Sequence, residues 1–271
     1  MSQHLNTEHF FHITALHTAF QAVYGADYYF GGESHDFWEI VIVTEGEIGV
    51  TAGKDVFHLR RGEAILHTPN EFHNLWSERG REAGFVIFTF SAAHLTPPPT
   101  RVFEVRDLAE PLSILTELRA ALQRHKGWIQ AVREGYEQKA ELALKRLELF
   151  LLQTVFESKL QKEANPLSQS AKNYAVAVKF LEENLHRNLS VGEIAEGCRM
   201  GEVNLKKIFS RYAGMGVIAY FNRLKIRAAT ELLARGATVR EASEAMGFLN
   251  QNYFCTVFKR VTGKPPKSFK G

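Results

Sequence analysis

The sequence predicts an α+β protein of more than one domain, with a β-barrel or β-sandwich at the front, a helical middle and an all-α back. Three observations predict this class. Runs of β-branched and aromatic residues alternate with turn residues in the first third, leucines recur at spacings of three and four in the middle, and the last hundred residues contain an internal repeat. A chain of 271 residues is long enough for about two domains.

The composition excludes several classes of protein. Hydrophobic residues make up 45% and charged residues 23% of the chain, which excludes a wholly disordered chain, a collagen and a coiled-coil rod. No run approaches the ~18 apolar residues of a membrane span, so we expect no membrane partner. The first residues do not resemble a signal peptide. The two cysteines, Cys198 and Cys255, do not make a disulfide framework, and we expect a cytoplasmic location.

Charge is divided unevenly along the chain. Residues 1–171 hold 16 Lys and Arg against 22 Asp and Glu, a net charge of −6, whereas residues 172–271 hold 17 against 8, a net charge of +9. Ten of the eleven histidines lie before residue 126. An acidic, histidine-rich front and a basic back predict two modules with different partners, the basic one a candidate for nucleic acid. A basic surface kept for solubility would give the same composition.

The first third of the chain reads as β-structure. We expect strands at residues 37–45, 48–52, 56–59, 64–67 and 83–90. Short strands at close spacing with turn signals between them are typical of a barrel or a sandwich. The three prolines at residues 97–99 cannot join a sheet ladder, so we place the end of a first domain, residues 1–100, there.

The middle segment, residues 101–162, reads as two helices. Residues 107–125 carry leucines at positions 108, 112, 115, 118 and 122. A longer helix is expected at 130–161, with an apolar stripe formed by Leu142, Leu149, Leu152, Phe156 and Leu160. Such a stripe marks a face that is buried, either against the barrel or against a second copy of the chain. We interpret the segment as a dimerisation region, followed by a polar linker.

The back hundred residues contain a repeat. Leu205, Ile208, Phe209 and Tyr212 recur 49 residues later as an apolar set at 254, 257, 258 and 261. Val191 and Glu193 recur 48 residues later, at 239 and 241. Each copy reads as a short helix, a tight turn and a longer helix. This is the shape of a helix-turn-helix motif, whose second helix enters the major groove of DNA.

In the first copy we expect a short helix at 191–197, with Ser190 as its N-cap, and a longer one at 202–212. The apolar positions of the longer helix fall on one face. The opposite face carries Val203, Lys206, Lys207 and Ser210, with Arg211 near the edge. A helix in the groove needs an apolar back and a short or basic front.

In the second copy we expect helices at 239–246 and 250–260, joined by a turn at residues 247–248. The front of the longer helix carries Asn250, Gln251, Asn252, Thr256, Lys259 and Arg260. Asn and Gln can bond the adenine edge with two hydrogen bonds, and Lys and Arg favour guanine or phosphate. A solvated helix face is the alternative, and the repeat on a basic domain favours DNA.

Residues 172–271 resemble the DNA-binding domain of AraC/XylS-type transcription regulators. The matching stretches are 189–195 (LSVGEIA), 205–209 (LKKIF), 220–227 (YFNRLKIR), 228–233 (AATELL), 244–248 (EAMGF), 252–259 (NYFCTVFK) and 263–269 (GKPPKSF). The resemblance implies two motifs in successive major grooves, joined by a helix at about 218–234. It also implies double-stranded DNA, a small-molecule effector and RNA polymerase as partners, a role as an activator and a homodimer.

The chain departs from this pattern in the turns. Arg199 stands where the family usually has Gly, and a left-handed turn there would cost a non-Gly residue about 1–2 kcal/mol. Gly201 replaces the usual Ser N-cap, and Ala242 and Ser243 replace the usual Ile-Ala pair. These departures concern the geometry of the turns and not the fold.

The front domain resembles the cupin-type effector domain of the same family. Glu39 and Gly46 match the first cupin motif, and Gly62, Pro69 and His73 approximate the second. Enzymatic cupins bind a metal through His-x-His, Glu and a later His, but Phe37 stands where the second His belongs. We expect a vestigial site, without a metal ion or other cofactor, that lines an apolar pocket for a small organic ligand. The candidate effector-binding residues are His35, Trp38, Glu39 and His73.

The sequence is therefore interpreted as a DNA-binding transcription regulator of the AraC/XylS type, gated by a small molecule such as a sugar, and not an enzyme. One alternative is a metal-dependent cupin enzyme with an incidental basic tail. Another is a constitutive DNA-binding regulator without an effector.

Overall fold

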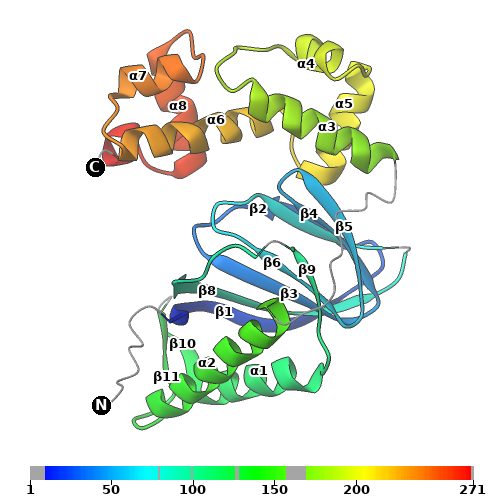
Figure 1. Ribbon diagram of the computed structural model, residues 1–271, viewed down its shortest axis with the longest axis vertical. Helices are drawn as coiled ribbons and strands as arrows, with labels where there is room; N and C mark the ends of the chain where they lie inside the picture. Colours follow the sequence, from blue (N-terminus) through cyan, green and yellow to red (C-terminus); the bar gives the residue numbers. More distant parts are fainter. Residues whose placement is uncertain (1–9, 79, 99, 126–127, 157–168, 270–271) are drawn as a thin grey trace, which may run out of the picture. The chain divides into compact units, whose positions relative to one another are not determined.

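The computed structural model describes residues 10–78, 80–98, 100–125, 128–156 and 169–269. The chain forms two compact units. One holds residues 1–52 and 57–165, and the other holds residues 53–56 and 166–271. The first unit is a β-structure with two helices, and the second is helical (Figure 1). The predicted α+β class with a β front and an all-α back is confirmed.

Two antiparallel sheets form the β-structure of the first unit. The five-stranded sheet has the order β1-β8-β3-β6-β9, and the four-stranded sheet has the order β2-β7-β4-β5. The strands of the larger sheet are β1 (His12–Tyr24), β8 (Ala83–Ala93), β3 (Trp38–Glu45), β6 (Glu63–His67) and β9 (Val102–Glu104). Those of the smaller sheet are β2 (Tyr29–Glu33), β7 (His73–Ser77), β4 (Glu47–Ala52) and β5 (Asp55–Arg60). All five predicted strands are present.

Alternation along β3 divides its side chains between two cores. Val41 and Val43 pack with residues of both sheets in the core between them. Ile40 and Ile42 point the other way, into a cluster that holds side chains of α1 (Ala109–Ala121) and α2 (Glu137–Leu151). Successive side chains of a strand point to opposite faces, so a strand that is buried on both faces is apolar throughout. This explains the continuous apolar run in β3.

Four strands of these two sheets lie outside the predicted set. β1 and β2 precede the first predicted strand, β7 lies between two predicted strands, and β9 follows the three prolines. β9 pairs with β6, so the sheet continues past residue 100, the expected end of the first domain. The alternation in β1 is interrupted by two register shifts, between Ile13 and Ala15 and between Leu16 and Thr18. A bulge removes the period of two by which a strand is detected in a sequence.

The helical middle differs from the prediction in extent. The helix expected at 107–125 ends at Ala121, and its last expected turn is instead β10 (Leu122–His125), paired with β11 (Trp128–Ala131). The helix expected at 130–161 begins only at Glu137, after Gly135 with its positive φ of 83°. α2 then runs into a π-helical turn, η1 (Leu152–Phe156). Residues 157–161 lie outside the described part of the chain.

The predicted apolar stripe of this helix is not buried within a single chain, which leaves burial against a second copy as the open alternative. Leu142 is 65% exposed, Leu149 52% and Leu152 38%. The side chains that α2 buries against the sheet and α1 are Ala143, Leu147, Phe150 and Leu151. The side chains of Phe156 and Leu160 lie outside the described set. The helix therefore has two apolar faces, and the one with exposed leucines remains uncovered in a single chain.

The second unit contains six α-helices among its described residues. They are α3 (Gln169–Glu183), α4 (Val191–Gly197), α5 (Glu202–Ala213), α6 (Val217–Ala234), α7 (Val239–Ala245) and α8 (Gln251–Thr262), followed by a 3₁₀ turn, η2 (Pro266–Phe269). Both predicted pairs of a short and a longer helix are present, and α6 joins them (Figure 1). Within the described residues we find no helix with the length and hydropathy that a membrane span requires.

Each helix pair of the second unit has its own core. Phe254, Val257 and Phe258 of α8 pack with residues of α6 and α7. Around the first pair, Tyr174 of α3 contacts the rings of Phe209 and Tyr212 of α5. These are the apolar positions that the repeat pairs with one another, and their burial leaves the opposite faces of α5 and α8 in solvent.

Candidate functional site

The first helix-turn-helix motif consists of α4 and α5. Ser190 and Glu193 form a capping box at the start of α4, in which the Ser190 hydroxyl accepts from the Glu193 backbone N–H and the Glu193 carboxylate accepts from that of Ser190. The turn contains Arg199 with a φ of 54°, the left-handed conformation expected for the family's glycine. Gly201 begins α5 without a side-chain cap. The motif forms although both of its turn positions depart from the family pattern.

The second motif, α7 and α8, uses more favourable residues at the same places. Thr238 and Glu241 form its capping box. Gly247 occupies the left-handed position of the turn, with a φ of 65°. The side chain of Asn250 caps α8 by accepting from the backbone N–H groups of Asn252 and Tyr253, at 2.8 and 3.1 Å.

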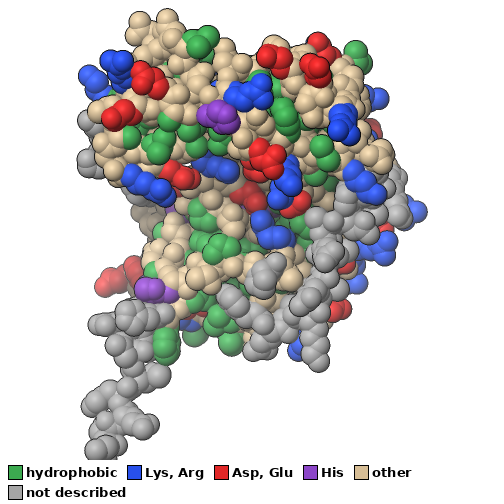
Figure 2. Space-filling view, turned by 45° about the horizontal axis from the view of Figure 1, so that its top comes forward, with side chains coloured by type: hydrophobic (Ala, Val, Ile, Leu, Met, Phe, Trp, Pro, Cys, Tyr) green, Lys and Arg blue, Asp and Glu red, His purple; other side chains and the backbone are tan. Residues whose placement is uncertain are grey.

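The outer face of α5 is polar and in solvent. Val203, Lys206, Lys207, Ser210 and Arg211 are all exposed, as the spacing predicts. The Lys206 ammonium lies 3.0 Å from the Glu202 carboxylate one turn earlier, and the Arg211 guanidinium lies over the Tyr212 ring. Figure 2 shows Lys and Arg side chains spread over the visible face of the protein and not gathered in one patch.

The outer face of α8 is also in solvent, and Asn250 has a capping role beside the DNA contact predicted for it. Gln251, Asn252, Thr256, Lys259 and Arg260 are exposed. Asn250 is exposed too, but its amide oxygen is engaged by the helix N-terminus, so it cannot also accept from a base. The amide nitrogen of Asn250 can still donate to a base edge, beside the amides of Gln251 and Asn252.

Sequence reasoning missed Leu249 and Tyr253. Leu249 is 90% exposed and Tyr253 is 52% exposed, beside the polar face of α8. A large apolar side chain so exposed next to a reading helix can contact the methyl group of thymine. The sequence offered one signal for Leu249, which is that this leucine does not fall on the apolar face of α8.

The two motifs are joined by buried contacts. Lys225 of α6 is 3% exposed, and its ammonium donates to the Arg187 carbonyl in the α3–α4 loop at 2.6 Å. Burial lowers the pKa of Lys225 to about 8. A Cβ atom on Gly247 would lie 2.3 Å from the His186 carbonyl oxygen of the same loop. The loop before the first motif therefore touches both the joining helix and the turn of the second motif.

In the first unit, three of the four predicted effector residues converge. His35, Glu39 and His73 bring their ring nitrogens and carboxylate together, and Glu33 joins them, so that one ligand atom of each lies within 4.8 Å of the others. Trp38, the fourth predicted residue, is not part of this group. It points to the opposite face of β3 and packs in the cluster with α1 and α2, as the alternation of a strand requires.

The two sheets and one loop position this polar cluster, which we define as Glu33, His35, Glu39 and His73. Glu33 and His73 are direct partners on the neighbouring strands β2 and β7. Gly32, with a φ of 90°, forms the irregularity before Glu33, and a Cβ atom there would lie 2.8 Å from the His73 carbonyl. Glu39 comes from β3 of the other sheet, and His35 from the loop between β2 and β3.

The ring orientations of both histidines are held by the backbone. His35 Nδ1 lies 3.0 Å from the Phe37 carbonyl oxygen, and His73 Nδ1 lies 3.1 Å from the Glu71 carbonyl oxygen. Because a carbonyl only accepts, each Nδ1 must carry the hydrogen and donate. The Nε2 atoms then face Glu39, at 3.5 Å for His35 and 3.4 Å for His73.

The cluster favours an ionised carboxylate. Burial alone would raise the pKa of Glu39, but the neighbouring His35 and His73 lower it well below its usual value. Burial alone would lower the pKa of His73, but Glu39 more than offsets this and raises it.

A second polar layer lies behind the cluster. The ring of His67 stacks on that of His73 with centroids 4.3 Å apart. His67 Nδ1 lies 3.3 Å from the Glu71 carboxylate, which also pairs with Arg101. Burial lowers the pKa of His67 to about 4, whereas His67 and Arg101 outweigh the effect of burial on Glu71 and lower its pKa to about 2.

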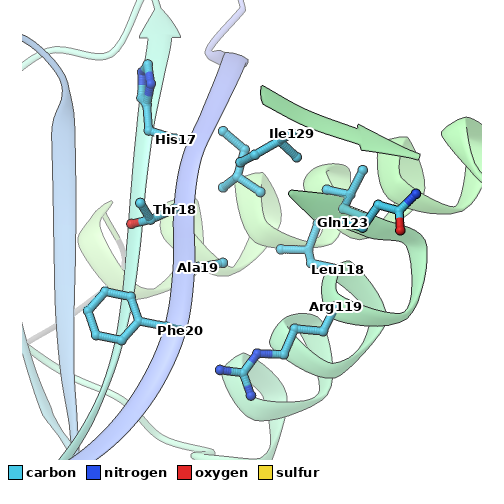
Figure 3. A pocket seen from close by; sticks show the side chains of 10 residues that line it. His17, Thr18, Ala19, Phe20, Leu118, Arg119, Gln123 and Ile129 are labelled. Atoms are coloured by element: carbon cyan, nitrogen blue, oxygen red, sulfur yellow. The ribbon is translucent and has the colours of Figure 1, made fainter. Parts of the chain in front are cut away.

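A separate cavity of about 330 Å³ lies between β1 and the α1–β10–β11 segment. Its lining is mainly apolar, with His17, Thr18, Arg119 and Gln123 as its polar residues, and Ala19 of β1 lies opposite Leu118 (Figure 3). None of the four predicted effector residues lines this cavity.

Two family models match the chain. The family described as "AraC-like ligand binding domain" matches residues 16–134, and a "Helix-turn-helix domain" matches residues 194–271. The first match spans both sheets and α1, and the second begins inside α4 and spans the rest of the second unit. Together they cover most of the chain.

The chain aligns with curated relatives over most of their length. The "HTH-type transcriptional activator RhaR" of Pectobacterium carotovorum is 23% identical over 240 residues, which is 87% of this chain and 84% of the relative. The "Uncharacterized HTH-type transcriptional regulator YfiF" of Bacillus subtilis is 24% identical over 245 residues, which is 87% of this chain and 77% of the relative.

Among solved structures, ToxT from Vibrio cholerae is 14% identical and covers 93% of this chain and 96% of its own, with a TM-score of 0.37. The DNA-binding domain of AdpA, solved with a target DNA, is 22% identical and covers 35% of this chain and 86% of its own, with a TM-score of 0.34. With both family matches falling on the two units described above, the chain belongs to the AraC/XylS family of transcription regulators and combines an AraC-like ligand-binding domain with a helix-turn-helix DNA-binding domain.

Proposed function

We propose that this regulator reads two neighbouring segments of the major groove with α5 and α8, and that a small molecule bound by the first unit controls it. The observation that carries the proposal is the pair of exposed polar helix faces, each backed by its own core, within a single compact unit. Successive major grooves on one face of DNA lie about 34 Å apart, so two joined motifs can read both.

The two reading helices are suited to different contacts. Lys207 on α5 offers a flexible cation for guanine or phosphate, and Gln251 and Asn252 on α8 offer amides for adenine. Lys206 and Arg211 add positive charge at the edges of the α5 face. Lys259 and Arg260 lie near the C-terminal end of α8, where we assign them to phosphate contacts.

DNA binding can be tested with the full-length protein. Binding to its operator should weaken with rising salt, because each phosphate that a cation neutralises releases counterions with a log–log slope of about −0.9. Residues 166–271, which make up most of the second compact unit, should keep this salt dependence when prepared alone. A slope of zero for both proteins would contradict the proposal.

The effector proposal keeps His35, Glu39 and His73 and drops Trp38. The three retained residues lie together in the first unit with Glu33, whereas Trp38 lies in another core. A ligand shifts a regulator only by its different affinity for two conformations. If the effector binds here, changing Glu39 should abolish the response to it and leave operator binding in its absence intact. Unchanged gene control without any effector would favour the constitutive alternative.

We also propose that the chain is a homodimer and that α2 forms the interface. The stripe of Leu142, Leu149 and Leu152 is exposed in the single chain. Large exposed apolar stripes usually mark a contact surface, and most homodimers are two-fold symmetric. The double variant Leu142→Glu/Leu149→Glu should sediment as a monomer, and Val132→Glu, an exposed apolar position outside α2, should not change the mass.

The remaining parts of the proposal concern transcription itself. RhaR and RhaS are among the curated relatives whose names call them activators. We propose that this chain likewise recruits RNA polymerase in the cytoplasm and has no catalytic activity of its own. Transcription from the operator with purified polymerase should rise when the regulator and its effector are added, and a fall would make it a repressor.

A further inference from the structure

We propose that Glu33, His35, Glu39 and His73 bind one divalent first-row transition-metal ion. The ion would belong to the first unit, and its binding does not depend on how the second unit reads DNA. The sequence predicted a vestigial, metal-free site because Phe37 replaces a histidine of the cupin pattern. His35, Glu39 and His73 are the three cupin-type donors that the sequence offers, and the structure adds Glu33 as a fourth, while Phe37 stacks on the His35 ring with centroids 3.8 Å apart.

The distances within the cluster suit a shared ion. Metal–nitrogen and metal–oxygen distances of about 2.0–2.1 Å in a tetrahedral site place neighbouring ligand atoms about 3.3–3.4 Å apart. The Nε2 atoms of His35 and His73 lie 3.5 and 3.4 Å from the two oxygens of Glu39, one from each. A charge-assisted hydrogen bond between such groups is usually about 2.7–2.9 Å long. The observed spacing is therefore that of ligands around one centre and longer than that of a direct pair.

The two histidines present unsatisfied nitrogen atoms to this centre. His35 Nε2 and His73 Nε2 are buried and make no hydrogen bond among the described residues. The His73 side chain is 3% exposed. Native proteins rarely bury polar atoms without a partner, because the lost contact with water is not replaced. A metal ion bound to both Nε2 atoms and to Glu39 would satisfy all three side chains.

The hydrogen bonds at the other nitrogens support the same inference. Histidine ligands usually donate their second ring N–H to a backbone carbonyl or a carboxylate, which fixes the tautomer and the ring orientation. His35 and His73 both do so, to the carbonyls of Phe37 and Glu71. Stacking on Phe37 and on His67 holds the two rings further. Two histidines are thus fixed with their lone pairs directed at one point.

The donors indicate which ions fit. Two imidazoles and two carboxylates, without a thiolate, suit zinc, iron, cobalt or nickel better than magnesium or calcium, which prefer oxygen donors alone. Two ionised carboxylates also balance the charge of a divalent ion. Glu33 is exposed while Glu39 and His73 are buried, so the cluster is open on the Glu33 side. A small chelating molecule could complete the coordination from there, which would join the metal to effector binding.

Metal binding can be measured on the full-length protein without DNA. The purified protein is stripped with a chelator and titrated with Zn²⁺ by calorimetry, with the bound metal counted by elemental analysis and the melting temperature followed. We expect one Zn²⁺ per chain and a rise in melting temperature, because a ligand that binds only the folded state stabilises it. Absence of binding at micromolar Zn²⁺, or binding that is unchanged in the variants below, would overturn the proposal.

The variants separate the cluster from other histidines. His73→Ala should weaken Zn²⁺ binding by at least the roughly 100-fold that losing an outer partner of a ligand can cost. His73 is buried, so its loss can also disturb folding, and Glu33→Gln serves as the second variant. Because Glu33 is exposed, this change should weaken Zn²⁺ binding and leave the melting temperature of the metal-free protein intact. His94→Ala, an exposed histidine outside the cluster, is the control and should bind like the unchanged protein. Operator binding by the stripped protein reports separately on the proposed function.

Discussion

The two helix-turn-helix motifs have the same helices and the same capping boxes, but they differ in the residues at their turns and at the N-caps of their longer helices. Both short helices begin with a capping box, Ser190 with Glu193 and Thr238 with Glu241. The first motif holds its left-handed turn with an arginine, whereas the second holds it with Gly247. The first reading helix has no side-chain cap and the second is capped by Asn250.

The two copies share their apolar positions and the caps of their short helices. The residues at their turns differ, because each turn packs against different neighbours. The turn of the second motif lies against the His186 carbonyl, and only a residue without a side chain fits there. Arg199 is exposed, and its left-handed conformation costs about 1–2 kcal/mol. Four predictions would break or sharpen this comparison.

The largest effect is expected for Gly247→Ala. A Cβ atom at this position would lie 2.3 Å from the His186 carbonyl oxygen, in a left-handed conformation that already disfavours alanine. We expect a loss of at least about 2 kcal/mol in the free energy of unfolding of the second unit, measured in urea. Gly263→Ala is the matched control, because Gly263 has a φ of 75° but open space around it. Equal losses in the two variants would show that packing at the second turn is unimportant.

Base contacts should come next in size. Lys207→Ala and Gln251→Ala should each lower affinity for the operator by about 1–3 kcal/mol and relax the preference for particular bases. Lys267 lies beyond α8 and is exposed, so Lys267→Ala should weaken binding to all sequences alike. Competition with operators mutated in one half at a time distinguishes these results. If all three variants lose affinity uniformly, α5 and α8 do not read bases.

A smaller effect separates the caps of the two reading helices. Asn250→Ala should cost about 1 kcal/mol of stability, because two backbone N–H groups lose their acceptor. Gly201→Asn should stabilise α5 by only a few tenths of a kcal/mol, since glycine is itself a tolerable N-cap and the position has room for a side chain. Urea unfolding of both variants measures the difference. Loss of base preference in Asn250→Ala, without loss of stability, would return Asn250 to the reading face.

The last prediction concerns pH and the contact that joins the motifs. Burial lowers the pKa of Lys225 to about 8 in the folded protein, from an ordinary value of 10.5. Between these values the unfolded chain binds more protons than the folded one, so stability relative to Lys225→Met should rise from pH 8 to pH 10.5. Unfolding curves of both proteins across this range test the sign. A stability difference that is constant with pH would mean that Lys225 keeps an ordinary pKa.

The sequence alone determined much of the second unit. The apolar period of the repeat predicted both helix pairs, Ser190 and Gly247 lie where the pattern placed them, and α6 lies where the family resemblance implied a joining helix. This succeeds because a helix shows its buried face within a few residues of chain. The same period predicted that Val203, Lys207 and Gln251 lie in solvent, as they do. Which face of a helix is polar is already visible in its own sequence, so no distant part of the chain is needed to predict it.

Only the tertiary structure decided which residues form the polar cluster, because its members come from distant strands and from one particular face of each strand. Glu33 joins the polar cluster only because a bulge at Gly32 turns it toward His73 on a neighbouring strand. Trp38 leaves the predicted site because its strand is buried on both sides, and an apolar run does not reveal which side each residue faces.

The helix α2 shows the same limit. Its sequence contains two apolar faces, one rich in leucine and the other including Ala143 and Phe150, and the period identifies both without ranking them. The face packed against the sheet and α1 carries Ala143, Leu147, Phe150 and Leu151, and Leu142 and Leu149 stay exposed. A local pattern states that a face is apolar, whereas shape complementarity with residues far along the chain decides which face is covered.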